Sequence, residues 1–142
     1  MNTFLVKHLT NQARPRIRET PASKPVNPLD IRVGDVVRFY GIRTSAPIRT
    51  DVRAVSDNYA LCTWPAPRRD AIDYTIISWK DGWRGPHNAW DRSTLTNEDC
   101  QDALAALEAG EIELAHGEVV YLDIAEIIRD GKTIFDDTED DL

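Results

Sequence analysis

The residues best suited to binding chemistry lie between positions 64 and 90, a stretch that holds all four tryptophans of the chain. Tryptophan and arginine dominate interface hot spots because they add a large contact area for little side-chain entropy. A bend at Gly85-Pro86 would project such side chains from the surface. We therefore expect a protein-binding loop here, with these candidate binding residues: Trp83, Arg84, His87, Asn88 and Trp90.

Residues for catalysis or metal binding do not occur at the required spacings. The three histidines are isolated, and there is no Cys-x-x-Cys or His-Glu-x-x-His pattern. The chain also has neither a lysine-containing phosphate loop nor a Gly-x-Ser-x-Gly turn. Cys62 and Cys100 lack a basic neighbour in sequence that would activate a thiol. We expect a non-enzymatic protein without metal or cofactor, in which both cysteines are buried and unpaired.

Arginines form a second set of binding candidates. Arg14, Arg16 and Arg18 alternate in the N-terminal segment, so an extended backbone would place them on one side. Further arginines follow near tyrosines and a tryptophan, an arrangement typical of surfaces that bind single-stranded nucleic acid. These arginines are Arg32, Arg38, Arg43, Arg49, Arg53, Arg68 and Arg69, and the aromatic residues near them are Tyr40, Tyr59 and Trp64. Nucleic-acid binding through the basic arm and strands, including Arg68 and Arg69, is the alternative function.

Charge is distributed unevenly along the 142 residues, whose formal net charge is -7. Residues 1–28 contain five basic residues and one acidic residue, whereas residues 96–142 contain fifteen acidic and two basic residues. The basic arm either grips phosphate or folds onto the acidic half of its own chain, and both interpretations stay open. A second alternative function follows from the acidic half, which could act as a DNA mimic that inhibits a DNA-binding protein.

The length fits one domain with a core of its own. Four prolines in residues 1–28 predict an extended arm, and the acidic run Asp136–Asp141 predicts disorder. We expect an arm over 1–28, a single α+β domain over 29–131 and a disordered acidic tail over 132–142. The longest apolar run, Ala103–Leu107, is too short to cross a membrane. No secretory segment is evident at the start, so we expect a cytoplasmic protein.

Most of residues 29–95 has the composition of short strands. Residues 31–40 and 52–61 are rich in β-branched and aromatic side chains, with Val52 and Ala54 expected on one face. Residues 72–80 alternate between two faces, and Asp81-Gly82 predicts a hairpin turn. We also expect a short strand at 112–114, another at 119–124 and a final helical turn over 125–128, closed by Gly131.

A helix is predicted after residue 95. Thr96 and Asp99 have the spacing of a capping box, and Leu95 and Cys100 have that of a hydrophobic staple. Apolar residues then recur at helical spacing until Gly110, which is expected to end the helix.

Two segments resemble known proteins. The segment Val33-Gly34-Asp35-Val36-Val37 resembles the start of SH3-like small barrels, which implies a small antiparallel β-barrel or bent sheet that binds peptides, nucleic acids or proteins. The segment Trp79-Lys80-Asp81-Gly82-Trp83-Arg84-Gly85-Pro86-His87-Asn88 resembles one found in small uncharacterised actinobacteriophage proteins. Together they imply a phage-encoded factor that binds a host protein.

Overall fold

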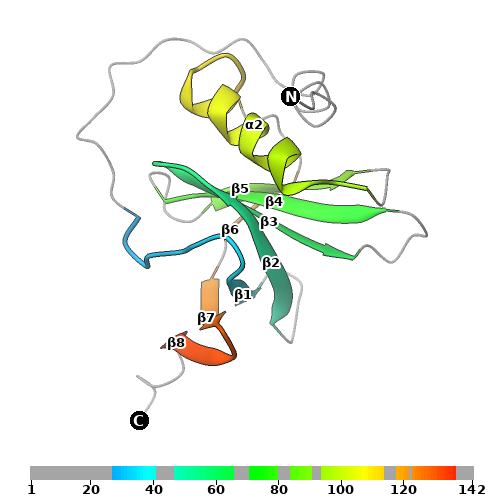
Figure 1. The fold of residues 1–142 in the computed structure, drawn as a ribbon. Coiled ribbons are helices and arrows are strands. Elements are labelled where there is room, and N and C mark those ends of the chain that lie inside the picture. The colour runs from blue at the N-terminus through cyan, green and yellow to red at the C-terminus, as the bar shows by residue number, and fades with distance from the viewer. Residues whose placement is uncertain are drawn as a thin grey trace.

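A computed structural model of the chain describes residues 27–40, 47–65, 71–79, 84–90, 94–113, 118–121 and 123–136. These residues form one helix and eight strands, as expected for an α+β fold (Figure 1). The elements in chain order are β1 (Val36–Tyr40), β2 (Ile48–Val55), β3 (Tyr59–Pro65), β4 (Ile72–Ser78), β5 (Arg84–Trp90), α2 (Asn97–Glu108), β6 (Glu118–Tyr121), β7 (Asp123–Arg129) and β8 (Lys132–Asp136). No helix among these residues is long and apolar enough to cross a membrane.

The strands form a single antiparallel sheet in the order β6-β5-β4-β3-β2-β1-β7-β8. Strands β6 and β8 lie at its two edges, so the sheet is open, and of the two expected forms, a small barrel or a bent sheet, the barrel is not confirmed. The antiparallel pairing of β4 with β5 confirms the hairpin expected around Asp81-Gly82, a turn that itself lies outside the described residues, and β2 pairs with β3 in the same antiparallel manner.

A short connection forces this open sheet to curl. A single residue separates β6 from β7, yet β6 pairs with β5 and β7 pairs with β1. In a flat sheet, the six strand spacings between β6 and β7 would cover roughly 29 Å. The Cα atoms of Tyr121 and Asp123 can be at most about 7 Å apart, because only one residue lies between them. The sheet must therefore bend until β5 and β1 come close together.

The curl produces two hydrophobic clusters, one on each face of the sheet. The cluster on the helix side joins β2–β5 to α2 and includes Leu61, Tyr74 and Leu104. The cluster on the other face joins β1–β4 to β7 and includes Val37, Ile77 and Ile127. Figure 1 shows α2 on one side of the sheet and the β7–β8 hairpin on the other. Strands β3 and β4 are consequently buried on both faces.

A β-bulge in β2 changes the face to which its side chains point. Val52 pairs with Cys62 and Ala54 pairs with Leu61, so one extra residue is inserted between the two pairs. Val52 therefore belongs to the cluster inside the curl, whereas Ala54 belongs to the cluster under the helix. The expectation that Val52 and Ala54 share a face is wrong, because strict alternation holds only in a strand without a bulge.

Helix α2 has the predicted boundaries. Thr96 is the N-cap, and the capping box with Asp99 is complete, with two hydrogen bonds of 3.1 Å between backbone N–H groups and side-chain oxygens. Leu95 and Cys100 are both buried in the cluster under the helix, as a hydrophobic staple requires. Gly110 follows the C-cap with a φ of +74°, a conformation that terminates helices.

Both ends of α2 are fastened to the β2–β3 hairpin. Near the start of the helix, the guanidinium of Arg53 donates hydrogen bonds to the carbonyl of Leu95 and the side chain of Asn97. At the other end, the Glu108 carboxylate accepts hydrogen bonds from the backbone N–H (2.8 Å) and the side chain of Asn58. These contacts fix the orientation of the helix on the sheet.

The C-terminal region differs from expectation. The helical turn expected over 125–128 is wrong, because these residues lie within strand β7. The β-branched side chains of Ile124 and Ile127 pack inside the curl, and this burial favours a strand over a helix. Strand β8 then pairs with β7, so the ordered part of the chain extends beyond residue 131 into the expected tail. The strand expected at 112–114 is not found at Ile112. The strand expected at 119–124 is divided between β6 and β7.

The β7–β8 turn consists of Asp130 and Gly131, with φ values of +52° and +76°. A Cβ atom added at Gly131 would meet no atom within 4 Å, so only the backbone conformation opposes a side chain there. We expect Gly131→Ala to lower the free energy of unfolding by about 1 kcal/mol in urea denaturation. The matched variant Gly131→Asn should lose less, because asparagine tolerates a positive φ better. Equal stability of Gly131→Ala and the wild type would contradict this turn geometry.

Candidate functional site

The segment predicted to form a protein-binding loop is part of the sheet. Residues 84–90 form strand β5, which pairs with β4 on one side and β6 on the other. Trp90 is only 7% exposed and belongs to the cluster under the helix, so its ring is not available as a surface anchor. The backbone of Arg84, His87 and Asn88 is placed in β5, and the expected bend at Gly85-Pro86 is replaced by strand.

The other predicted contacts lie outside the described residues. These are Trp83 and six arginines, namely Arg14, Arg16, Arg18, Arg43, Arg68 and Arg69.

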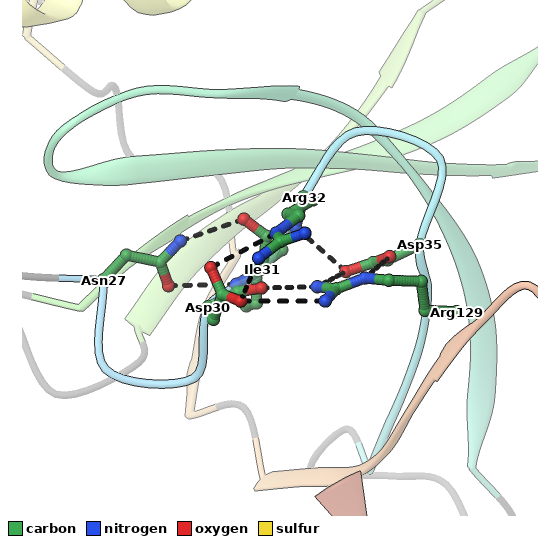
Figure 2. Close-up of polar contacts among 6 residues, drawn as sticks. All are labelled: Asn27, Asp30, Ile31, Arg32, Asp35 and Arg129. Carbon is green, nitrogen blue, oxygen red and sulfur yellow. Dashed lines mark hydrogen bonds and ion pairs between the residues drawn. The ribbon is translucent and has the colours of Figure 1, made fainter. Parts of the chain in front are cut away.

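A polar cluster is built around Asp35, which is almost completely buried before β1 (Figure 2). Arg129, at the end of β7, binds the Asp35 carboxylate through Nε and Nη2, each at 2.8 Å. The backbone N–H of Arg32 donates a third hydrogen bond to this carboxylate at 2.9 Å. Burial alone raises the pKa of Asp35, but these hydrogen bonds outweigh it and hold the pKa below its ordinary value of 3.8.

The same cluster holds residues 27–35 against the end of the curled sheet. Arg129 also donates a 2.6 Å hydrogen bond to the carbonyl of Asp30. The Asn27 carboxamide bonds both the N–H (3.2 Å) and the carbonyl (2.9 Å) of Ile31, as a neighbouring strand would. Ile31 is thereby held inside the curl at 1% exposure. Because the charges at Asp35 and Arg129 satisfy each other, we assign this cluster a structural role.

Two other arginines predicted as possible nucleic-acid contacts are engaged within the fold. Arg53 fastens α2 to the sheet and also donates to the Thr63 hydroxyl at 3.2 Å. Arg38 in β1 forms a 2.9 Å ion pair with Glu126 in β7, although its side chain is still 41% exposed. Arg53 is therefore a structural residue, whereas Arg38 retains an accessible guanidinium.

Arg49 differs from these arginines. It lies near the start of β2, is exposed and pairs in register with Arg38, so both side chains project from the same face of the sheet. Among the residues that the structure describes, Arg49 has no carboxylate partner. Tyr40 follows two residues after Arg38 on the same face and is 37% exposed. We call Arg38, Tyr40 and Arg49 the β1–β2 arginine face.

The other aromatic residues near these arginines are directed inward. Tyr59 is 5% exposed under the helix. Trp64 packs edge-on against Phe39 inside the curl, with ring centroids 5.8 Å apart. Tyr40 is therefore the one member of the predicted aromatic set that offers an accessible ring among the described residues.

Sequence reasoning named the residues of this face but could not group them. The register of β1 against β2 decides which arginines are neighbours, and the sequence alone does not reveal it. The useful signal was the alternation of Val37 and Phe39 with Arg38 and Tyr40, which assigns the polar pair to the opposite face.

The described residues offer little for covalent or metal chemistry. Cys62 and Cys100 are buried and free, and burial raises the pKa of each thiol to about 12, so both stay protonated at neutral pH. Within the described ranges, no three His, Cys, Asp or Glu side chains are grouped so that they could hold a metal ion.

Comparisons with known proteins were made with the whole sequence and with the structure. No protein-family model, no curated protein and no solved structure matches the chain significantly.

The Asp35–Arg129 ion pair makes the stability of the fold depend on pH. The pKa of Asp35 is lower in the folded protein than in the unfolded chain, so the stabilisation is complete above about pH 4 and is lost as pH falls through the folded pKa. We expect wild type to be more stable than Asp35→Asn at pH 7. Urea denaturation at several pH values should show this difference shrinking below pH 3.8.

Asp30→Asn is the matched control, because it removes a carboxylate from the same cluster. The side chain of Asp30 is 65% exposed. The free energy of unfolding of Asp30→Asn should differ little from that of the wild type at every pH. Parallel pH profiles of the wild type and Asp35→Asn down to pH 2.5 would contradict the assignment.

Proposed function

We propose that the protein is a non-enzymatic binding module for nucleic acid, and that the β1–β2 arginine face contacts the phosphate backbone. The observation that carries this proposal is the pairing of Arg38 and Arg49 directly across two strands on an exposed face. Arg38 already pairs with Glu126, whereas Arg49 has no carboxylate partner among the described residues, so a bound anion would supply the charge partner that Arg49 lacks. Arginine is well suited to phosphate because its planar guanidinium can donate two parallel hydrogen bonds.

The strand connections at the end of the sheet where Arg49 lies also have basic sequences. Strands β1 and β3 finish, and strands β2 and β4 begin, at the end where Arg49 lies. The two connections that start there, 41–46 and 66–70, contain Arg43, Arg68 and Arg69 in their sequences and one acidic residue, Asp70. Basic residues distant in sequence are therefore attached to neighbouring strand ends.

The net charge of -7 opposes binding of a polyanion, and the proposal depends on where the acidic residues lie. Three of them lie in register with or beside the arginine face: Glu126 neutralises Arg38, Asp123 pairs in register with Tyr40, and Asp51 pairs in register with Val36. Many others belong to residues 96–142, and the exposed side of α2 is acidic. Helix α2 packs over the later part of β2, at Arg53 and Ala54, whereas Arg49 lies near the start of that strand, so the acidic helix and Arg49 occupy different ends of β2.

A more specific fold assignment, to the SH3-like small barrels, accompanies the proposed function. We infer that the curled sheet is a variant of the SH3-like small barrel, in which residues 118–129 supply two consecutive strands, one beside β5 and one beside β1. The interior cluster around Val37, Cys62 and Ile127 supports this inference, because it gathers side chains from strands across the curl. Such barrels are used mostly as binding modules.

The other functions expected from the sequence have less support from the described side chains. A protein partner bound through residues 83–90 would have to use β5 without Trp90, which is buried. DNA mimicry by the acidic half stays a prediction, as do a phage origin and a cytoplasmic location.

Fluorescence anisotropy with a labelled 20-nucleotide oligonucleotide, single-stranded and duplex, tests the proposal. We expect wild-type protein to bind at 20 mM salt and the affinity to fall steeply as salt rises. Arg49→Ala should weaken binding about fivefold and reduce the slope of log affinity against log salt by about 1, because one phosphate contact is lost.

Arg32→Ala is the matched control, since Arg32 is also an exposed arginine, and its guanidinium pairs with Asp30 before the start of β1. It should bind like the wild type. Failure of the wild type to bind either oligonucleotide, or equal losses in Arg49→Ala and Arg32→Ala, would contradict the proposal.

A further inference from the structure

We infer that the nucleic acid bound by the β1–β2 arginine face is single-stranded, with a base stacked on Tyr40 beside a phosphate held by Arg49. This inference rests on the proposed function and specifies its ligand. It follows from the secondary structure that carries the accessible side chains: helix α2 is acidic, whereas the accessible arginines and Tyr40 lie on strands.

The helix is unsuited to reading duplex DNA. Helices that enter the major groove carry basic and amide side chains toward the phosphates and base edges. Helix α2 has no lysine or arginine in Asn97–Glu108, and its exposed positions include Glu98 at the start. An acidic helix would be repelled by the phosphates on both sides of a groove. Within the described residues, no other helix is present.

The sheet surface, in contrast, has the features of a platform for single strands. Proteins that bind single-stranded nucleic acid combine arginines that follow the backbone with aromatic rings on which unpaired bases stack. Tyr40 is 37% exposed and lies two residues from Arg38 along β1, which is roughly 7 Å in a strand. Arg49 pairs with Arg38 across the strands, so Tyr40 and Arg49 lie on one face, while the Arg38 guanidinium is bound to Glu126 in β7.

A base in a duplex cannot stack on this ring, because its faces are covered by neighbouring base pairs. Stacking on Tyr40 therefore discriminates between the two forms of nucleic acid, whereas phosphate contacts to Arg49 do not. The ring tolerates any base, since every base has a π-face. We accordingly expect preference for single strands with little dependence on sequence.

The test compares Tyr40→Ala, Tyr40→Phe and wild type in the same anisotropy assay, with a mixed-sequence 20-nucleotide single strand and its duplex. We expect the wild type to bind the single strand at least about tenfold more tightly than the duplex. Tyr40→Ala should lose about tenfold for the single strand and little for the duplex. Tyr40→Phe keeps the ring and should restore binding. Thermal unfolding confirms that each variant is folded.

Two outcomes would overturn the inference while leaving the proposed function intact. One is equal affinity of the wild type for single strand and duplex, with Arg49→Ala still weakening both. The other is that Tyr40→Ala binds the single strand as tightly as the wild type does. If the wild type binds neither form, or Arg49→Ala has no effect, the proposed function itself fails and this inference fails with it.

Discussion

The single residue between β6 and β7 is the constraint on which the rest of the fold depends. Because Tyr121 and Asp123 are so close in the chain, strands β5 and β1 cannot lie at opposite sides of a flat sheet. The resulting curl creates an interior that Ile31, Val37 and Ile127 fill. The outer face of β2–β5 is covered by α2, which packs against it through Leu104 and Leu107.

The two ends of the curled sheet differ in chemistry for physical reasons. At one end, residues 27–35 cover the interior, and the Asp35–Arg129 ion pair fastens them with charges that satisfy each other. At the other end, β1 and β2 present Arg38 and Arg49 side by side, and Arg49 has no acidic partner within the described residues. Neutralised charge thus supports the fold at one end, and an exposed arginine, Arg49, lies at the other.

Local signals in the sequence predicted local structure well. The helix and its capping box followed from Thr96 and Asp99, because capping depends on residues three positions apart. Features set by distant contacts could not be predicted in this way. The bulge after Val52, the pairing of Arg38 with Arg49 and the burial of Trp90 all depend on which strands become neighbours. The turn at Asp130-Gly131 is a local signal that indicated the β7–β8 hairpin but was interpreted only as the end of a helical turn.

The most direct test of the central claim is an NMR titration of the ¹⁵N-labelled protein with a single-stranded oligonucleotide. Binding at the β1–β2 arginine face predicts that the amide signals of Arg38, Tyr40 and Arg49 shift progressively, while those of α2 stay in place. Salt should reverse the shifts, because the contacts are with phosphates. Shifts confined to α2 or to the β7–β8 hairpin, or no shifts at all, would contradict the account.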